Sequence, residues 1–102
     1  MNARDKQWLA ELAREQPTPF WVLMPRVSQT HYFELADALQ NIAQKVRICY
    51  SVKTNPHEKI LHSLNKMESG FECVSARELA AVKSFSGQKI FNSCASSDEE
   101  IK

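Results

Sequence analysis

Lys53 is the residue of this sequence best placed to do chemistry. It ends an apolar segment, residues 46–53, that predicts a buried strand, and a helix-start signal follows directly. A period of two puts the bulky side chains on one face and the smaller Cys49 and Ser51 on the other, with Lys53. A lysine at the C-terminal end of a parallel strand can be desolvated, lose its proton near neutral pH and attack a carbonyl carbon to form a Schiff base. On position alone, a lysine that reaches into water is the simpler interpretation.

The cysteines and histidines do not suggest a metal site or a disulfide framework. Cys49, Cys73 and Cys94 are separated by more than twenty residues and fall in apolar, strand-like segments. This spacing favours small buried thiols in a reducing compartment. His57 and His62 are five positions apart and would not share one face of a helix. We therefore assign no metal.

Composition narrows the class of partner. The chain has 102 residues, of which 43% are hydrophobic and 25% charged, as in an ordinary globular domain. A net charge of +1 without a long charged run gives no indication of nucleic-acid or membrane-surface binding. The apolar runs are too short to cross a bilayer, and the charged N-terminal region does not resemble a signal peptide. We therefore expect a cytoplasmic protein whose partner is a small molecule or another protein.

The N-terminal part of the chain predicts two helices joined by a short strand. Helical spacing of apolar residues predicts a first helix over residues 2–15, with Asn2 as its N-cap. A Pro-Thr-Pro motif ends it, and residues 20–24 then predict a short, fully buried strand. A second amphipathic helix is predicted over residues 26–44, because apolar residues again recur at helical spacing after a proline.

The rest of the chain repeats a strand-then-helix unit. Three strands are predicted, over residues 46–53, 71–75 and 89–94. Each is followed by a helix-start signal, whose capping residue is Asn55, Ser75 and Ser97 in turn. Glycines fit the ends of the intervening units, at Gly70 and Gly87. This regular alternation predicts βα units and a parallel sheet, and hence an α/β fold.

The number of units is too small for a closed barrel. Eight units need about 250 residues, whereas this chain contains three predicted units in 102 residues. The last predicted helix is cut off near its start, at Lys102. We therefore expect the chain to be the N-terminal part of a larger protein, because an isolated piece would leave a parallel sheet with an open edge.

Four blocks of residues carry a resemblance to a known family. They are Thr-Pro-Phe-Trp-Val at 18–22, Cys-Tyr-Ser-Val-Lys-Thr-Asn at 49–55, Gly-Phe-Glu-Cys-Val-Ser-Ala-Arg-Glu-Leu at 70–79, and Ile-Phe-Asn with Asp-Glu-Glu-Ile within 90–101. In this order they are similar to successive strands and helix starts of the pyridoxal-phosphate-dependent decarboxylases with an alanine-racemase-like barrel. That family acts on ornithine, diaminopimelate, arginine and related basic amino acids.

The resemblance implies an architecture and a cofactor. Residues 26–102 would form the first part of a truncated (β/α) barrel that binds pyridoxal 5'-phosphate, with about three βα units. Residues 1–25 would belong with a second, β-rich domain. Lys53 would form the Schiff base with the cofactor, yield it to the substrate amine and recapture it after the α-carboxylate is lost. In full length the protein would be a homodimer.

Glu72 is the second cofactor-site residue that the resemblance indicates. It follows Lys53 by 19 positions, as the acidic residue of ornithine decarboxylases does, although the family more often has aspartate there. From a neighbouring strand it could pair with Lys53 and bias its protonation. A carboxylate in water is the alternative interpretation. Glu78 is most simply the capping residue of the following helix.

Other parts of the family's site have no match in this sequence, which has only two glycines and no glycine-rich phosphate loop. We therefore expect these residues alone to be inactive. The leading hypothesis is the N-terminal segment of a lyase, a basic amino-acid decarboxylase of polyamine or lysine biosynthesis. The alternatives are a non-catalytic decarboxylase-like regulator, an inactive truncated remnant, or racemisation or cofactor carriage on the same barrel. The sequence leaves the choice of substrate open.

Overall fold

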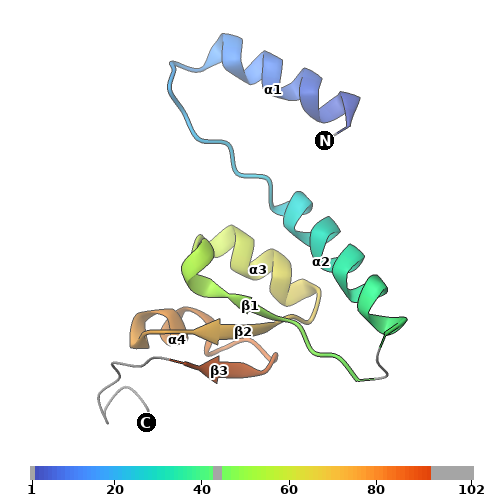
Figure 1. Ribbon diagram of the computed structural model, residues 1–102. Helices are drawn as coiled ribbons and strands as arrows, with labels where there is room; N and C mark the ends of the chain where they lie inside the picture. Colours follow the sequence, from blue (N-terminus) through green and yellow to red (C-terminus); the bar gives the residue numbers. More distant parts are fainter. Residues whose placement is uncertain (1, 43–44, 93–102) are drawn as a thin grey trace.

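Helices and strands alternate along the chain in the computed structural model, which describes residues 2–42 and 45–92 (Figure 1). The elements are α1 (Ala3–Glu15), α2 (Pro25–Gln40), β1 (Cys49–Ser51), the 3₁₀ helix η1 (Val52–Thr54), α3 (Glu58–Lys66), β2 (Gly70–Cys73), α4 (Ala76–Val82) and β3 (Lys89–Phe91). The predicted α/β class is confirmed. The third capping motif, at Ser97, lies outside the described residues.

The strands form one parallel sheet in the order β1-β2-β3. Ser51 of β1 is aligned with Glu72 of β2, and Glu72 is aligned with Ile90 of β3. Each strand is joined to the next through a helix, α3 and then α4. Sequential parallel strands with helical crossovers are the arrangement of consecutive βα units, so the prediction of a partial barrel is confirmed.

One hydrophobic core joins the sheet to the helices. Phe71 and Cys73 of β2 are fully buried, and α3 contributes Ile60, Leu61 and Leu64, which recur at helical spacing. The core consists of Val52, Ile60, Leu61, Leu64, Phe71, Cys73, Val82 and Phe85. Because successive strand residues point to opposite faces, Glu72 lies on the face of β2 that is turned away from this core.

Two of the predicted helix caps form as expected. The side-chain oxygen of Asn2 accepts a hydrogen bond from the backbone N–H of Asp5 at 2.8 Å, at the start of α1. At the start of α4, Ser75 Oγ accepts from the backbone N–H of Glu78 at 3.2 Å, and Glu78 Oε1 accepts from the backbone N–H of Val74 at 3.2 Å. The bonds from Asp5 and Glu78 satisfy helix N–H groups that have no partner within the helix, and the bond from Val74 ties the residue before the cap to α4.

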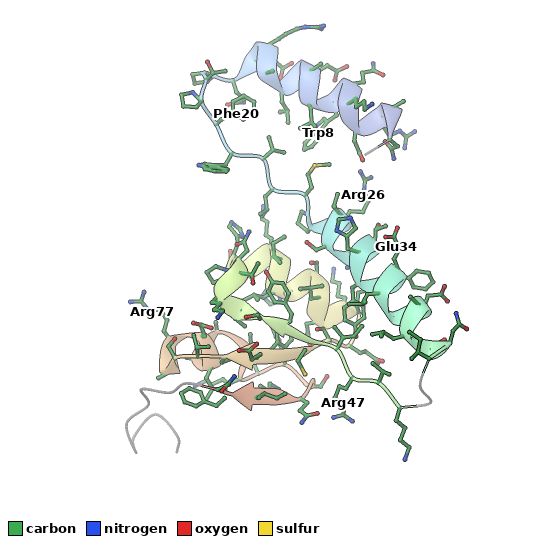
Figure 2. All side chains as sticks on the ribbon, in the orientation of Figure 1. Trp8, Phe20, Arg26, Glu34, Arg47 and Arg77 are labelled. Atoms are coloured by element: carbon green, nitrogen blue, oxygen red, sulfur yellow. The ribbon has the colours of Figure 1, made fainter. Side chains whose placement is uncertain are left out.

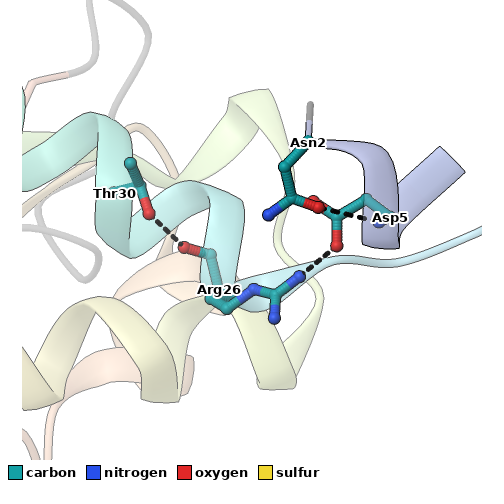
Figure 3. A network of polar contacts seen from close by, with 4 residues as sticks. All are labelled: Asn2, Asp5, Arg26 and Thr30. Carbon is teal, nitrogen blue, oxygen red and sulfur yellow. Dashed lines mark hydrogen bonds and ion pairs between the residues drawn. The ribbon is translucent and has the colours of Figure 1, made fainter.

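A polar network ties α1 to the start of α2 (Figure 3). The carboxylate of Asp5 is buried and accepts a hydrogen bond from the guanidinium of Arg26. On the other side, the backbone carbonyl of Arg26 accepts from the hydroxyl of Thr30 at 3.1 Å. Asp5 therefore serves both as a residue of the first turn of α1 and as the anchor of that helix on α2.

The strand predicted over residues 20–24 is wrong for this structure. These residues have no regular secondary structure and connect α1 to α2 (Figure 1), and the side chain of Trp21 is fully exposed. An extended apolar segment becomes a strand only where another strand pairs with it. Within residues 2–42 and 45–92, no strand pairs with this segment.

The helix that follows Lys53 begins later than predicted. The N-cap of α3 is His57, whose Nδ1 accepts from the backbone N–H of Lys59 at 3.1 Å. Asn55, the predicted cap, instead accepts from the backbone N–H of His57 at 3.0 Å through its side-chain oxygen. A short polar turn therefore precedes the helix, because Asn55 stabilises that turn and not the first helical N–H groups.

Neither glycine caps a helix as predicted. After α3 the left-handed residue is Glu68, with φ of 62°, and Gly70 already belongs to β2. α4 ends at Val82, well before Gly87. Gly87 instead permits a close backbone approach, because a Cβ atom there would lie 2.1 Å from the carbonyl oxygen of Ser69.

Candidate functional site

Lys53 lies just beyond the end of β1, within η1, and not at the last position of a strand as predicted. β1 ends at Ser51, and the backbone then tightens into a 3₁₀ turn. Val52 is fully buried in the core and anchors this turn, whereas Lys53 is exposed. The lysine amine is therefore accessible at the C-terminal edge of the parallel sheet, the edge at which ligands bind in α/β proteins.

Tyr50 fixes the segment that carries Lys53. Its hydroxyl donates a hydrogen bond to the backbone carbonyl of Asn55 at 3.1 Å, and its ring packs against the core. Burial raises the pKa of the Tyr50 hydroxyl, which the bond to Asn55 partly offsets, so this group remains a donor at neutral pH. The segment is thus held by a buried side chain at one end and by a hydrogen bond at the other.

Ser51, Glu72 and Ile90 form a row across the three strands, on the face opposite the core. Glu72 is half-buried and Ile90 is exposed. Cys49 lies on the same face, because its Sγ is 2.6 Å from the position that a Cβ atom on Gly70 would occupy. The register therefore brings Glu72 to the strand beside Ser51, two residues before Lys53 in the chain. The structure brings both predicted site residues to one edge of the sheet.

Ser51 is a site residue that sequence reasoning missed. Its Oγ is buried and has no hydrogen-bond partner among the residues that the structure describes. A buried hydroxyl without a partner costs about 1–3 kcal/mol, and such groups deserve a functional explanation. In the sequence, Ser51 is only a small residue on the lysine face of a strand, and no spacing rule marks its hydroxyl.

Two carboxylates near β2 help to raise the pKa of a buried thiol. Burial raises the pKa of Cys73, and the negative charges of Glu78 and Glu72 raise it further, against a smaller opposite effect of Lys89. Cys73 is fully buried, so its thiol is a neutral core group as the sequence predicted. Glu78 serves as the capping residue described above, and Glu72 is the acidic side chain on the exposed face of the sheet.

The largest concavities lie elsewhere on the molecule. One cavity of about 500 Å³ is lined by residues that include Arg47, Gly70 and Gln88, at the N-terminal edge of the strands. There Arg47 donates a hydrogen bond to Gln88 Oε1 at 2.6 Å. In Figure 2, Arg47, which precedes β1, and Arg77, which lies in α4, are on opposite sides of the sheet. Lys53 follows the C-terminal end of β1 in the chain. A further cavity of about 370 Å³ is lined by residues that include Cys49, Tyr50 and Ser51 of β1. The candidate site is the accessible sheet edge that follows this strand.

Neither a metal-binding cluster nor a membrane-spanning helix is found in the part of the chain that the structure describes. Among those residues, no group of three or more His, Cys, Asp or Glu side chains is arranged to hold a metal ion. None of the helices described for residues 2–42 and 45–92 is both long enough and apolar enough to span a membrane.

Comparison with known proteins shows the family to which this chain belongs. The profile described as "Pyridoxal-dependent decarboxylase, pyridoxal binding domain" matches residues 30–100, which include Lys53 and Glu72. This chain belongs to that family. The matched residues include the three parallel strands and the two helices that connect them, so the predicted resemblance is confirmed.

Two relatives of the decarboxylase family are similar to nearly the whole chain. A diaminopimelate decarboxylase from Vibrio cholerae serotype O1 is 29% identical over 97 residues, which are 92% of this chain and 23% of that protein. A diaminopimelate decarboxylase from Campylobacter jejuni is 30% identical over 97 residues, which are 90% of this chain and 23% of that protein. The chain thus spans less than a quarter of either relative. No solved structure gives a significant match.

Proposed function

We propose that this chain is the lysine-bearing N-terminal segment of a decarboxylase that acts on a basic amino acid. The observation that carries the proposal is the accessible amine of Lys53 beside the row of Ser51 and Glu72 at the C-terminal edge of the sheet. Membership of the pyridoxal-dependent decarboxylases supports it. The chemistry is that of a carbon–carbon lyase, in which the substrate loses its α-carboxylate.

The residues at this edge fit pyridoxal 5'-phosphate chemically. The cofactor, when bound, supplies an aldehyde that condenses with amines and a ring that accepts the electron pair left by carbon dioxide. Lys53 offers an exposed primary amine for the aldehyde. Ser51 offers a buried hydroxyl that has no partner among the described residues. The amine of Lys53 and the hydroxyl of Ser51 are thus two polar groups near the end of β1 that such a cofactor could contact.

Each residue has a distinct part in the proposal. Lys53 would hold the cofactor through its Nζ amine. Glu72 would contribute a negative charge on the neighbouring strand, although no ion pair between it and Lys53 forms among the described residues. Tyr50 is a positioning residue, because its hydrogen bond to Asn55 fixes the turn that carries Lys53.

The rest of the architecture follows from the same proposal. Residues 26–102 would be the first part of the cofactor-binding barrel, and residues 1–25 would belong with a second, β-rich domain. The full exposure of Trp21 supports this division, because a large aromatic side chain in an apolar segment is usually covered. We further propose that the whole protein is a homodimer.

Diaminopimelate is the first substrate to test, because both relatives reported above are diaminopimelate decarboxylases. Ornithine and arginine are the other candidates. Release of labelled carbon dioxide from each amino acid, measured for the natural gene product with added pyridoxal phosphate, tests the activity. We expect turnover with one of the three substrates, loss of turnover in Lys53→Ala, and no effect of Lys83→Ala, which changes an exposed lysine after α4. Turnover that survives Lys53→Ala would contradict the proposal.

A non-catalytic decarboxylase-like protein, or an inactive remnant, is the second candidate. The specific observation in its favour is Glu72, since the resembling family more often has the shorter aspartate at this position on the exposed face of β2. For this candidate, none of the three amino acids would release carbon dioxide in the presence of pyridoxal phosphate. The substitution Glu72→Asp would then be the informative variant, because it restores the family's residue at that position.

A further inference from the structure

A second concave site lies between α2 and α3, outside the sheet edge that carries Lys53. It has a volume of about 490 Å³, and its lining includes Arg26 from α2 and Lys59, His62 and Lys66 from α3. The three α3 residues are spaced by three and four positions and so share one face of that helix. Basic side chains from two helices therefore converge on one groove.

The walls of this groove are held together. α2 packs against α3, and Gln29 Nε2 donates a hydrogen bond to the backbone carbonyl of Ser63 at 2.9 Å. Both residues line the groove. Arg26 also forms an ion pair with the buried carboxylate of Asp5, as Figure 3 shows. The groove is thus built on packed helices and not on loops.

The charge balance of the lining is positive. Arg26, Lys59 and Lys66 carry positive charges, and Glu58 is the single acidic residue of the described lining. Asp5 neutralises part of the charge of Arg26 from outside the groove. Lys59 and Lys66 are seven positions apart, which is about 10 Å along a helix. Two flexible ammonium groups at this separation suit a ligand with an anionic group at each end.

We propose that this groove binds a small, elongated polyanion, with phosphate or carboxylate groups at both ends. Lys59 and Lys66 would each contact one anionic group, and Gln29 and Arg26 would form the opposite wall. Charge-assisted hydrogen bonds from ammonium groups to such anions are stronger than neutral ones. Neither Lys53 nor Glu72 takes part, so this site is independent of the proposed decarboxylase chemistry.

Titration of the purified chain with pyrophosphate, at constant ionic strength set by sodium chloride, tests the site. Amide chemical shifts in NMR spectra report where binding occurs. We expect saturable shifts centred on residues 59–66 and weaker binding, by about tenfold, in the double variant Lys59→Gln/Lys66→Gln. The matched control is Lys6→Gln/Lys83→Gln, which removes the same charge from exposed positions on α1 and after α4 and should bind as the unmodified chain does.

A second variant keeps the test decisive if the double variant is poorly folded. Glu58→Gln removes the acidic residue of the groove and should tighten pyrophosphate binding. Titration with citrate shows whether carboxylates are accepted as phosphates are. Lys53→Ala should bind pyrophosphate normally, so the outcome is separate from that of the decarboxylase proposal. Shifts that do not saturate, or equal weakening by both double variants, would overturn the proposed site.

Discussion

Ser51 and Glu72 are aligned partners on adjacent parallel strands, and Lys53 follows Ser51 by two residues in the turn that ends β1. This alignment brings a lysine and a carboxylate that are 19 positions apart in the chain to the same edge of the sheet. Ser51 itself carries a buried hydroxyl without a partner among the described residues. The proposed cofactor site is built on this relationship.

The unpartnered hydroxyl of Ser51 should reduce stability. Replacing a buried polar group that makes no hydrogen bond with an apolar group of similar size removes its desolvation cost. We expect Ser51→Ala to increase the free energy of unfolding by about 1 kcal/mol, measured by urea denaturation of the purified chain. A loss of stability in this variant would mean that the hydroxyl makes a favourable interaction in the folded chain.

Ser75 is the matched case in which a serine hydroxyl does have a partner. Its Oγ accepts from the backbone N–H of Glu78 and caps α4. We expect Ser75→Ala to lower the free energy of unfolding by about 1 kcal/mol, the usual cost of a lost N-cap. The same urea experiment therefore gives opposite signs for the two serine substitutions, and equal signs would contradict this assignment.

Gly87 should not tolerate a side chain. A Cβ atom there would lie 2.1 Å from the carbonyl oxygen of Ser69 and 3.0 Å from its carbonyl carbon, both of them backbone atoms of a fully buried residue. We expect Gly87→Ala to destabilise the chain by about 2–4 kcal/mol. Ser86→Ala, at the exposed neighbouring position, is the control and should change the midpoint of thermal unfolding little.

Stability should fall at high pH. Burial is the main cause that raises the pKa values of Tyr32, Tyr50 and Cys73 in the folded chain. As pH rises past the ordinary values, about 8.5 for cysteine and 10 for tyrosine, the unfolded chain loses protons that the folded chain keeps. The contribution of these groups to the free energy of unfolding is thus complete at pH values below their ordinary pKa values. It is lost as the pH rises through their raised pKa values in the folded chain.

Urea midpoints measured between pH 7 and pH 11 check this dependence. Tyr50→Phe removes one of the titrating groups and should flatten the decline above about pH 10, after a constant loss from the missing bond to Asn55. A midpoint that stays constant over this range would show that these groups titrate alike in the folded and unfolded chains.

Local signals in the sequence predicted much of the fold. The caps at Asn2 and Ser75 depend on residues three positions apart, and the inward face of α3 depends on helical spacing, so both are visible in the chain itself. The order of strands followed from the alternation of units. At the candidate site, the sequence predicted the pair of Lys53 and Glu72. The strand register brings both residues to one edge of the sheet.

Features that depend on distant neighbours were not predictable in this way. The period-two pattern continues past Ser51, but pairing with β2 stops there and the backbone enters η1. Residues 20–24 have the composition of a strand, yet strand formation needs a partner. Position 87 requires glycine because the backbone of Ser69 lies too close to leave room for a Cβ atom. Whether Ser51 Oγ finds a hydrogen-bond partner depends on which groups the fold places around it.

Reductive trapping tests the central claim most directly. The purified chain is incubated with pyridoxal phosphate, reduced with borohydride, digested and mapped by mass spectrometry. We predict that the pyridoxyl group is found on Lys53 in preference to the exposed Lys59 and Lys83, and that Lys53→Ala removes this preference without increasing modification elsewhere. Equal modification of the exposed lysines, with Lys53 no more reactive than the others, would contradict the assignment of Lys53 as the cofactor-bearing residue.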